Sequence, residues 1–145
     1  MQSRILYTEG KGHFAEGTID ISDVTPNQIR VASKKTGVCR SDIDMMNGNF
    51  GPLPLNMQGH EGLGEVVEVG AQITDVKVGD YVATRGEPAY ADFYNAEDGT
   101  YVKVPSLDPK YIVEPVACGL NVVMQEEAQF EARSNKNAKM CISGS

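Results

Sequence analysis

Apolar and polar residues alternate over several short stretches of the chain, which is typical of β-strands with one buried face. The clearest alternation covers 28–35, where Ile29, Val31 and Ser33 fall on one side. Glycine, proline or acidic turns bound similar stretches elsewhere. These patterns predict strands at 3–7, 14–21, 28–35, 65–70, 90–94 and 101–104, and a turn within 76–82 that leads into one more strand.

Two segments break this pattern. Glycines and prolines accumulate between 36 and 61, with at most one helical turn near 41–46, and a loop this long inside a domain is usually functional or disordered. From 113 to about 130, apolar residues recur near helical spacing and predict the one substantial helix. The regular spacing of strands and turns favours a mainly β fold, a small and partly open barrel with short helices and a C-terminal helix.

The composition is that of an ordinary globular domain. Its 145 residues, 41% of them apolar and 23% charged, suffice for one domain with its own core. The net charge of −7 argues against nucleic-acid and anionic-membrane partners. No apolar run reaches the length of a membrane span and the first residues lack a signal-peptide pattern, so we expect a cytoplasmic protein. The three cysteines are widely spaced and odd in number, which indicates free thiols or metal ligands rather than disulfides.

The irregular segment holds side chains of the types that can bind zinc. Cys39 and His60 lie 21 residues apart, and Glu114 follows much later at the start of the predicted helix. Thiolate, imidazole and carboxylate are the ligand types of an open, catalytic zinc site, which keeps a fourth position for water or substrate. Taken singly, each residue has a simpler reading, because a lone cysteine is most often a small buried apolar residue. Only the combination argues for a metal.

Three residues beside Cys39 could support such a site. Asp42 could accept the second ring N–H of His60 and fix its tautomer. Ser41 could pass a proton from a substrate hydroxyl to solvent. Arg40 suits a phosphate, since its guanidinium fork matches phosphate oxygens.

Three sequence motifs together resemble the zinc-dependent medium-chain dehydrogenases, the superfamily of alcohol, polyol, threonine and glucose dehydrogenases. They are Gly-Val-Cys-Arg-Ser-Asp at 37–42, Gly-His-Glu-Gly-Leu-Gly-Glu-Val at 59–66 and Val-Gly-Asp-Tyr-Val at 78–82. The resemblance runs in order from about Ile29 to the end of the chain. It implies a GroES-like catalytic domain and oxidation of a small-molecule alcohol, polyol or sugar with NAD(P).

The resemblance also implies a role for each metal-binding candidate. Cys39 and His60 match two ligands of one catalytic zinc, and Glu114 falls where the family places its third. Glu61 matches the neighbour that can exchange onto the metal, so the choice between Glu61 and Glu114 stays open. The segment 83–90 replaces the four-cysteine lobe of many relatives and contains no cysteine, so we expect no structural zinc.

Further roles follow from the same resemblance. Asp42 matches the aspartate behind the metal ligands, and Ser41 the hydroxyl that relays the alcohol proton. Asp44 stands where some relatives have a histidine that ends this relay, and a carboxylate there can also accept a proton. Arg40 is the candidate for a cofactor phosphate.

The end of the chain resembles the start of a second domain. Residues 139–145 are similar to the first strand of an NAD(P)-binding Rossmann fold, with Gly144 as the first glycine of its phosphate-binding turn. We therefore expect a GroES-like domain at 1–112, a junction helix and linker at 113–138, and a truncated Rossmann strand at 139–145. On this reading the chain is a fragment that lacks NAD(P) binding and turnover by itself, and the missing domain is its natural partner.

Two other functions remain open. One is a zinc-less member similar to quinone reductases, against which Cys39 and His60 argue. The other is a non-enzymatic GroES-like module, in which 39–60 would be a loop that binds a partner. On the fragment reading, the junction helix would lack the domain it packs on, which favours a homodimer through the C-terminal third of the chain or poor order after about residue 126.

Overall fold

The computed structural model describes residues 1–51, 54, 58–86 and 88–133, and side chains up to residue 125. The expected linker at 134–138 and the expected strand at 139–145, with Gly144, lie outside the described residues. The chain divides into two compact units, Met1–Glu114 and Pro115–Ser145. The elements in order are β1 (Gln2–Tyr7), β2 (Ala15–Asp20), β3 (Gln28–Thr36), α1 (Arg40–Met46), β4 (Glu61–Val69), β5 (Tyr81–Arg85), β6 (Phe93–Glu97), β7 (Tyr101–Val104), the 3₁₀-helix η2 (Pro109–Tyr111) and α2 (Glu114–Arg133).

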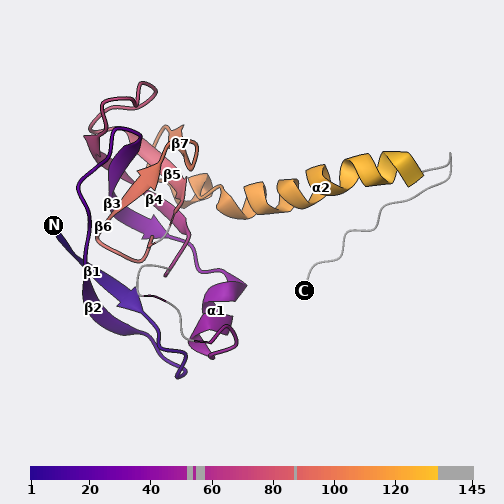
Figure 1. Ribbon diagram of the computed structural model, residues 1–145, viewed down its shortest axis with the longest axis horizontal. Coiled ribbons are helices and arrows are strands. Elements are labelled where there is room, and N and C mark those ends of the chain that lie inside the picture. The colour runs from indigo at the N-terminus through magenta and orange to yellow at the C-terminus, as the bar shows by residue number, and fades with distance from the viewer. Residues whose placement is uncertain (52–53, 55–57, 87, 134–145) are drawn as a thin grey trace. The chain divides into compact units, whose positions relative to one another are not determined.

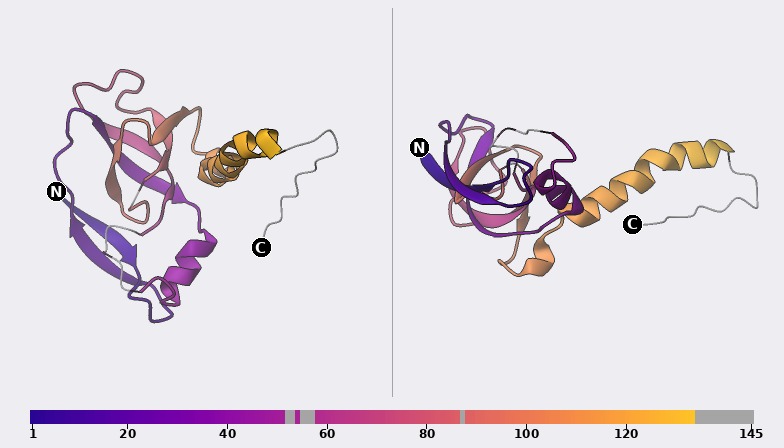
Figure 2. Two further views of the ribbon diagram at one scale, coloured as in Figure 1. Left: turned by 45° about the vertical axis from the view of Figure 1, so that its right-hand side comes forward. Right: turned by 90° about the horizontal axis from the view of Figure 1, so that it is seen from below.

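The first unit is built from two antiparallel sheets. β1 and β2 form a two-stranded sheet, and the other five strands form a second sheet in the order β6-β3-β4-β5-β7 (Figure 1). Both sheets stay open, as the two further views show (Figure 2). The mainly β, partly open architecture expected from the sequence is confirmed. The central strand β4 pairs with β3 on one side and β5 on the other, so its residues are held from both edges.

Two strand predictions need correction. β4 begins at Glu61, four residues before the predicted start at 65, because Glu61 pairs in register with Arg85 at the end of β5. β6 begins at Phe93 rather than at Tyr90, which lies in a turn after Pro88. Although β6 and β7 follow each other in sequence, they do not pair with each other, since β6 pairs with β3 and β7 with β5.

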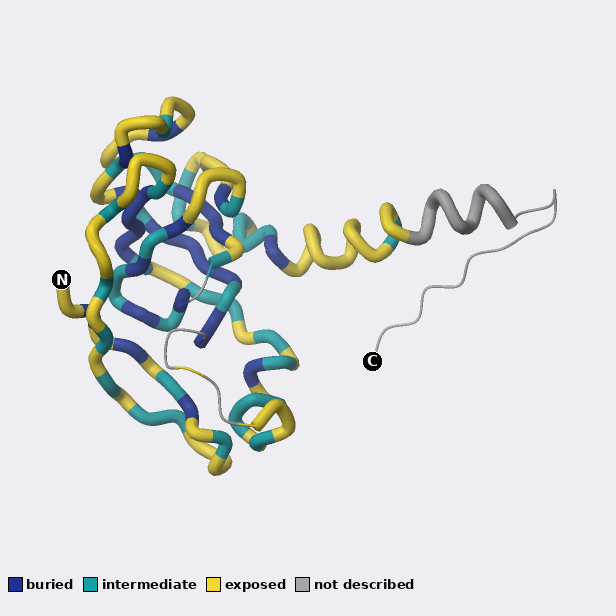
Figure 3. The backbone as a smooth tube through the Cα atoms, viewed as in Figure 1, coloured by how far each residue is buried: buried dark blue, intermediate teal, exposed yellow. Residues whose placement is uncertain are grey.

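The core of the first unit lies along the five-stranded sheet, where buried segments gather (Figure 3). Ile29, Val31, Val66 and Val82 are fully buried, and burying each such side chain contributes about 1.5–3 kcal/mol. Tyr94 is buried with them, and its hydroxyl lies 2.7 Å from that of Thr84. Burial raises the pKa of Tyr94 to about 12. The inward side chains of β3, β4 and β5 thus fix the register that places the start of β4.

The helix α2 runs from Glu114 to Arg133, close to the predicted 113–130. Up to residue 125, four large apolar side chains on it are exposed, namely Val116, Leu120, Val122 and Met124. No described helix combines the length and apolar character needed to cross a bilayer.

Candidate metal centre

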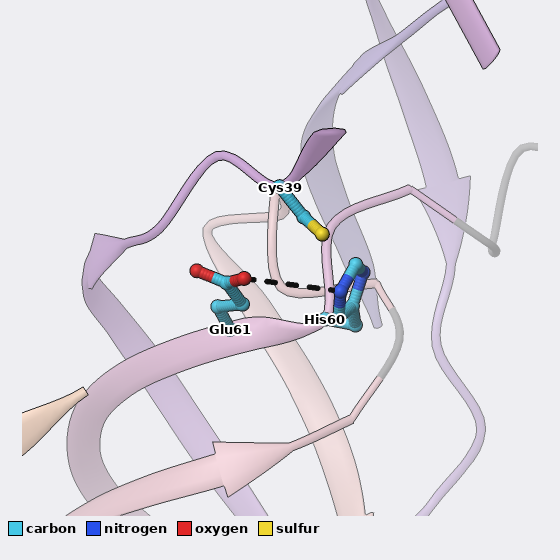
Figure 4. A group of neighbouring side chains, drawn as sticks. All are labelled: Cys39, His60 and Glu61. Atoms are coloured by element: carbon cyan, nitrogen blue, oxygen red, sulfur yellow. Dashed lines mark ion pairs between the residues drawn. The ribbon is translucent and has the colours of Figure 1, made fainter. Parts of the chain in front are cut away.

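Three potential metal ligands converge between the start of α1 and the start of β4. Cys39 is the N-cap residue of α1, His60 directly precedes β4, and Glu61 is the first residue of β4. One ligand atom from each side chain lies within 4.8 Å of the other two. Figure 4 shows the Cys39 thiol and the Glu61 carboxylate directed toward the His60 ring. The sequence predicts all three for the site, and the fold brings them together.

Glu114 joins this group from the other end of the first unit. Its side chain is buried, and its Oε2 lies 3.9 Å from His60 Nε2. Glu61 Oε1 lies 4.0 Å from the same ring nitrogen, so the imidazole has two carboxylates at nearly equal distance. Both glutamates that the sequence leaves as alternatives are therefore close to His60.

The electrostatics of the group favour a bound cation. Burial raises the pKa of Glu61, and the nearby charges of Glu114 and Asp42 raise it further, while His60 opposes them. Charged carboxylates in a buried cluster are costly unless a cation compensates them. Zinc bonds of ~2.0–2.3 Å in tetrahedral geometry place donor atoms ~3.3–3.8 Å apart, so the thiol, imidazole and carboxylate groups need only a small contraction. The residues present therefore fit a zinc ion.

Two glycines leave the space in which the side chains of the cluster approach one another. A Cβ on Gly37 would lie 1.8 Å from Glu61 Oε2, so any larger residue would displace that carboxylate. Gly59 has φ +76°, a conformation that costs an L-residue about 1–2 kcal/mol, and a Cβ there would meet the Tyr90 ring at 2.5 Å. The glycines that accompany Cys39 and His60 in the motifs thus have steric reasons to be glycine.

Asp42 organises the turn that carries Cys39. It is buried, and its Oδ2 accepts a hydrogen bond of 2.7 Å from the Cys39 backbone N–H. This is one half of a capping box, which fixes the first turn of α1. The hydrogen bonds found for Asp42 among the described residues do not include the ring N–H of His60, so the tautomer-fixing role stays a prediction.

A hollow of about 280 Å³ opens beside the cluster. Ser41 and His60 both line it, which places the predicted relay hydroxyl beside one predicted metal ligand. Met45, Arg85 and Gly86 complete its described lining. A substrate hydroxyl near His60 would therefore also be near Ser41.

Two predicted site residues, Arg40 and Asp44, pair with each other. The Arg40 side chain is 80% exposed, and its Nε lies 3.3 Å from Asp44 Oδ2. The second Asp44 oxygen accepts a 3.0 Å hydrogen bond from Asn49 Nδ2. Neither Arg40 nor Asp44 is among the described residues that line the hollow. Their roles in phosphate binding and proton relay stay predictions.

Sequence reasoning misses two residues at the site. Tyr90, which the strand pattern places in the core, donates its hydroxyl to the Gly37 carbonyl at 3.3 Å. Burial raises the pKa of Tyr90, and Asp42 raises it further. Arg85 lines the hollow, although in the sequence it is only part of the cysteine-free segment that replaces the zinc lobe. Its register with Glu61 in the β4–β5 ladder would place Arg85 at the site. A β4 strand expected to begin at residue 65 leaves this pair out.

Residues 25–117 match the family described as the alcohol dehydrogenase GroES-like domain, and this match covers more than half of the chain. The chain belongs to this family. The mainly β fold and the clustered motif residues agree with that membership. The resemblance drawn from the three motifs is confirmed.

The individual relatives carry the names of several different enzymes. A Leishmania amazonensis protein named "Probable quinone oxidoreductase" is 36% identical over 66% of this chain and 28% of its own length. Sorbitol dehydrogenase 2 of Saccharomyces cerevisiae is 41% identical over 57% of this chain and 24% of its own length. A cinnamyl alcohol dehydrogenase structure from Sorghum bicolor has the same fold, with a TM-score of 0.71, 16% identity, and coverage of 94% of this chain and 50% of that one. The chain thus spans half or less of each of these proteins. Proteins with this domain include oxidoreductases that act on alcohols and polyols.

Proposed function

We propose that this chain is the catalytic domain of a zinc-dependent alcohol or polyol dehydrogenase that uses NAD(P). The observation that carries the proposal is the convergence of Cys39, His60 and Glu61, with Glu114 at 3.9 Å from the same imidazole. The 41% identity to sorbitol dehydrogenase 2 supports a polyol or related alcohol as substrate.

Cys39 and His60 would hold the zinc ion, together with Glu61 or Glu114. Bound there, zinc supplies Lewis-acid polarisation of the substrate hydroxyl, and a nicotinamide supplies the hydride acceptor. Ser41 lies in the same hollow as His60 and would take the hydroxyl proton and pass it to solvent. Asp42 would hold Cys39 in place through the backbone hydrogen bond at the start of α1.

A quinone oxidoreductase without zinc is the second candidate. The Leishmania relative, 36% identical over 97 residues, favours it. Three potential ligand atoms within 4.8 Å of one another favour the zinc enzyme instead, because a quinone reductase of that kind has no need of such a cluster. Metal binding therefore separates the two candidates.

The test is a zinc titration of the chain, with metal content measured after gel filtration. We expect about one zinc per chain and a loss of at least ~100-fold in affinity for Cys39→Ala and for His60→Ala, since each removes a direct ligand. His13→Ala is the matched control, because the His13 side chain is exposed. Circular dichroism confirms that each variant is folded. Zinc binding that is absent, or unchanged in both ligand variants, would contradict the proposal.

Glu61→Gln and Glu114→Gln separate the two carboxylates. Substitution of the direct ligand should lower zinc affinity by about tenfold or more, whereas substitution of the other should have a smaller effect. Equal, small effects of both substitutions would mean that neither glutamate is a ligand.

We expect no turnover from residues 1–145 by themselves, because these residues contain no complete Gly-x-Gly-x-x-Gly dinucleotide fingerprint. NAD(P)-dependent oxidation of a panel of alcohols and polyols checks this, and activity that survives repurification would contradict it.

The exposed apolar residues of α2 favour a homodimer through that helix. Light scattering should give twice the chain mass, with Leu120→Glu monomeric. A monomer at all concentrations would count against the dimer.

A further inference from the structure

Arg85 occupies a position at the candidate site that none of the roles above uses. It is the last residue of β5 and pairs in register with Glu61, the first residue of β4. Residues directly opposite each other in an antiparallel pair project to the same face of the sheet. The Glu61 carboxylate turns toward Cys39 and His60 (Figure 4), whereas Arg85 is exposed and lines the hollow that His60 and Ser41 share.

The charge of Arg85 is not compensated within the described part of the chain. Each ion pair found there joins other residues, and the carboxylates of Glu61 and Glu114 pair with His60, at 4.0 and 3.9 Å from its Nε2. An arginine guanidinium carries five donors in a planar fork that fits a carboxylate or a phosphate bidentately. It is also weakly hydrated compared with an ammonium group, so it gives up water readily to such a ligand.

The lining arranges three kinds of contact in one small space. His60 and Ser41 would receive a hydroxyl, Met45 offers an apolar wall for a carbon chain, and Arg85 offers the positive charge. Drug-sized ligands occupy pockets of ~300–1,000 Å³, so a hollow of about 280 Å³ suits a smaller molecule. With a net charge of −7, the protein as a whole repels anions, and a local cation is needed to bring one to the site.

We propose that Arg85 selects substrates whose alcohol group is accompanied by an anionic group, a phosphate ester or a carboxylate. This rests on the proposed dehydrogenase function and specifies its substrate class. The hydroxyl lies toward His60 and Ser41, and the anionic group pairs with the Arg85 guanidinium. Arg85 thereby fixes which end of the substrate faces the metal centre.

The test is an NMR titration of the zinc-loaded chain with three probes of similar size, namely glycerol, glycerol 1-phosphate and glycerate. The backbone amides of Ser41 and Gly86 report on the hollow. We expect at least one anionic probe to bind about tenfold or more tightly than glycerol, and the comparison of the two shows which anion is preferred. Arg85→Gln should remove this preference, and Arg85→Lys should keep part of it.

Lys103→Gln is the matched control for general charge. Lys103 is a cation on the neighbouring strand β7, its Nζ lies 2.7 Å from Asp80 Oδ2, and it is not part of the described lining. Its removal should leave the preference unchanged. Equal affinity for all three probes, or a preference that Arg85→Gln retains, would overturn the proposal.

The zinc titration distinguishes a failure of the Arg85 proposal from a failure of the proposed dehydrogenase function. A chain that binds zinc through Cys39 and His60 but shows no anion preference refutes the role of Arg85 alone. If the chain binds no zinc, the same three probes are titrated into the metal-free protein. An Arg85-dependent preference there supports an anion site and refutes the dehydrogenase, whereas its absence refutes both.

Discussion

The two sides of α1 differ sharply although they come from one short motif. Asp42 is buried and bonded to the backbone of Cys39, whereas the Arg40 side chain is 80% exposed and paired with Asp44. Helical geometry explains the division, because residues three or four apart share a face and neighbours in sequence do not. The helix therefore turns only some of the motif residues toward the candidate metal centre. The inward side supports the site, and the outward side stabilises the helix.

The largest expected effect comes from crowding the inward side. Gly37→Ala places a Cβ against Glu61 Oε2, and overpacking of this kind costs about 1–3 kcal/mol. The displaced carboxylate should also reduce zinc affinity, by about tenfold or more if Glu61 is a ligand. Chemical denaturation and a zinc titration measure the two effects.

Gly119→Ala is the control for this substitution. Gly119 lies in α2, and a Cβ added there would meet nothing within 4 Å. Alanine favours a helix by up to about 1 kcal/mol over glycine, so this substitution should be neutral or stabilising. Destabilisation by Gly119→Ala as large as that by Gly37→Ala would remove the steric explanation.

A second effect, on folding stability alone, distinguishes the two aspartates. Asp42→Ala leaves the N–H of Cys39 without its acceptor, which should cost about 1–3 kcal/mol of folding free energy. Asp44→Ala removes only exposed contacts with Arg40 and Asn49 and should cost about 0.5 kcal/mol. Urea denaturation of both variants measures the difference, and equal losses would contradict the division of α1 into two faces.

The smallest effect is expected at Arg40. Its ion pair with Asp44 has i,i+4 spacing on an exposed surface, and such pairs contribute about 0.3–0.5 kcal/mol. Arg40→Ala should lose this amount at low salt and almost nothing at about 1 M salt, because salt screens exposed charges. A loss that persists at high salt would indicate a role beyond this pair.

Much of the fold could be predicted from local patterns. The alternation at 28–35 corresponds to β3, and the apolar spacing after 113 corresponds to α2. Local patterns do not predict which strands pair with each other. The start of β4 depends on the ladder with β5, and the separation of β6 from β7 depends on which neighbours each strand finds.

The same limit explains what could be predicted of the site. Cys39 and His60 stand in motifs that are recognisable in sequence, and resemblance alone places Glu114. Arg85 lies in no such motif, and its position beside the hollow depends on strand register. The direction of each side chain on α1 likewise depends on the helix, since the motif itself does not separate Arg40 from Asp42.

The candidate zinc ligands are far apart along the chain, which has a consequence for the order of folding. Cys39 precedes α1, Glu61 opens the central strand, and Glu114 ends the first unit, so the cluster assembles only when distant segments meet. Loop closure makes such contacts slow to form, so under the proposed function a zinc ion would bind the finished sheet rather than guide its formation. Zinc at about 100 times its dissociation constant would add about 2.7 kcal/mol to the stability of the folded unit. Metal occupancy would then report whether the sheet is complete.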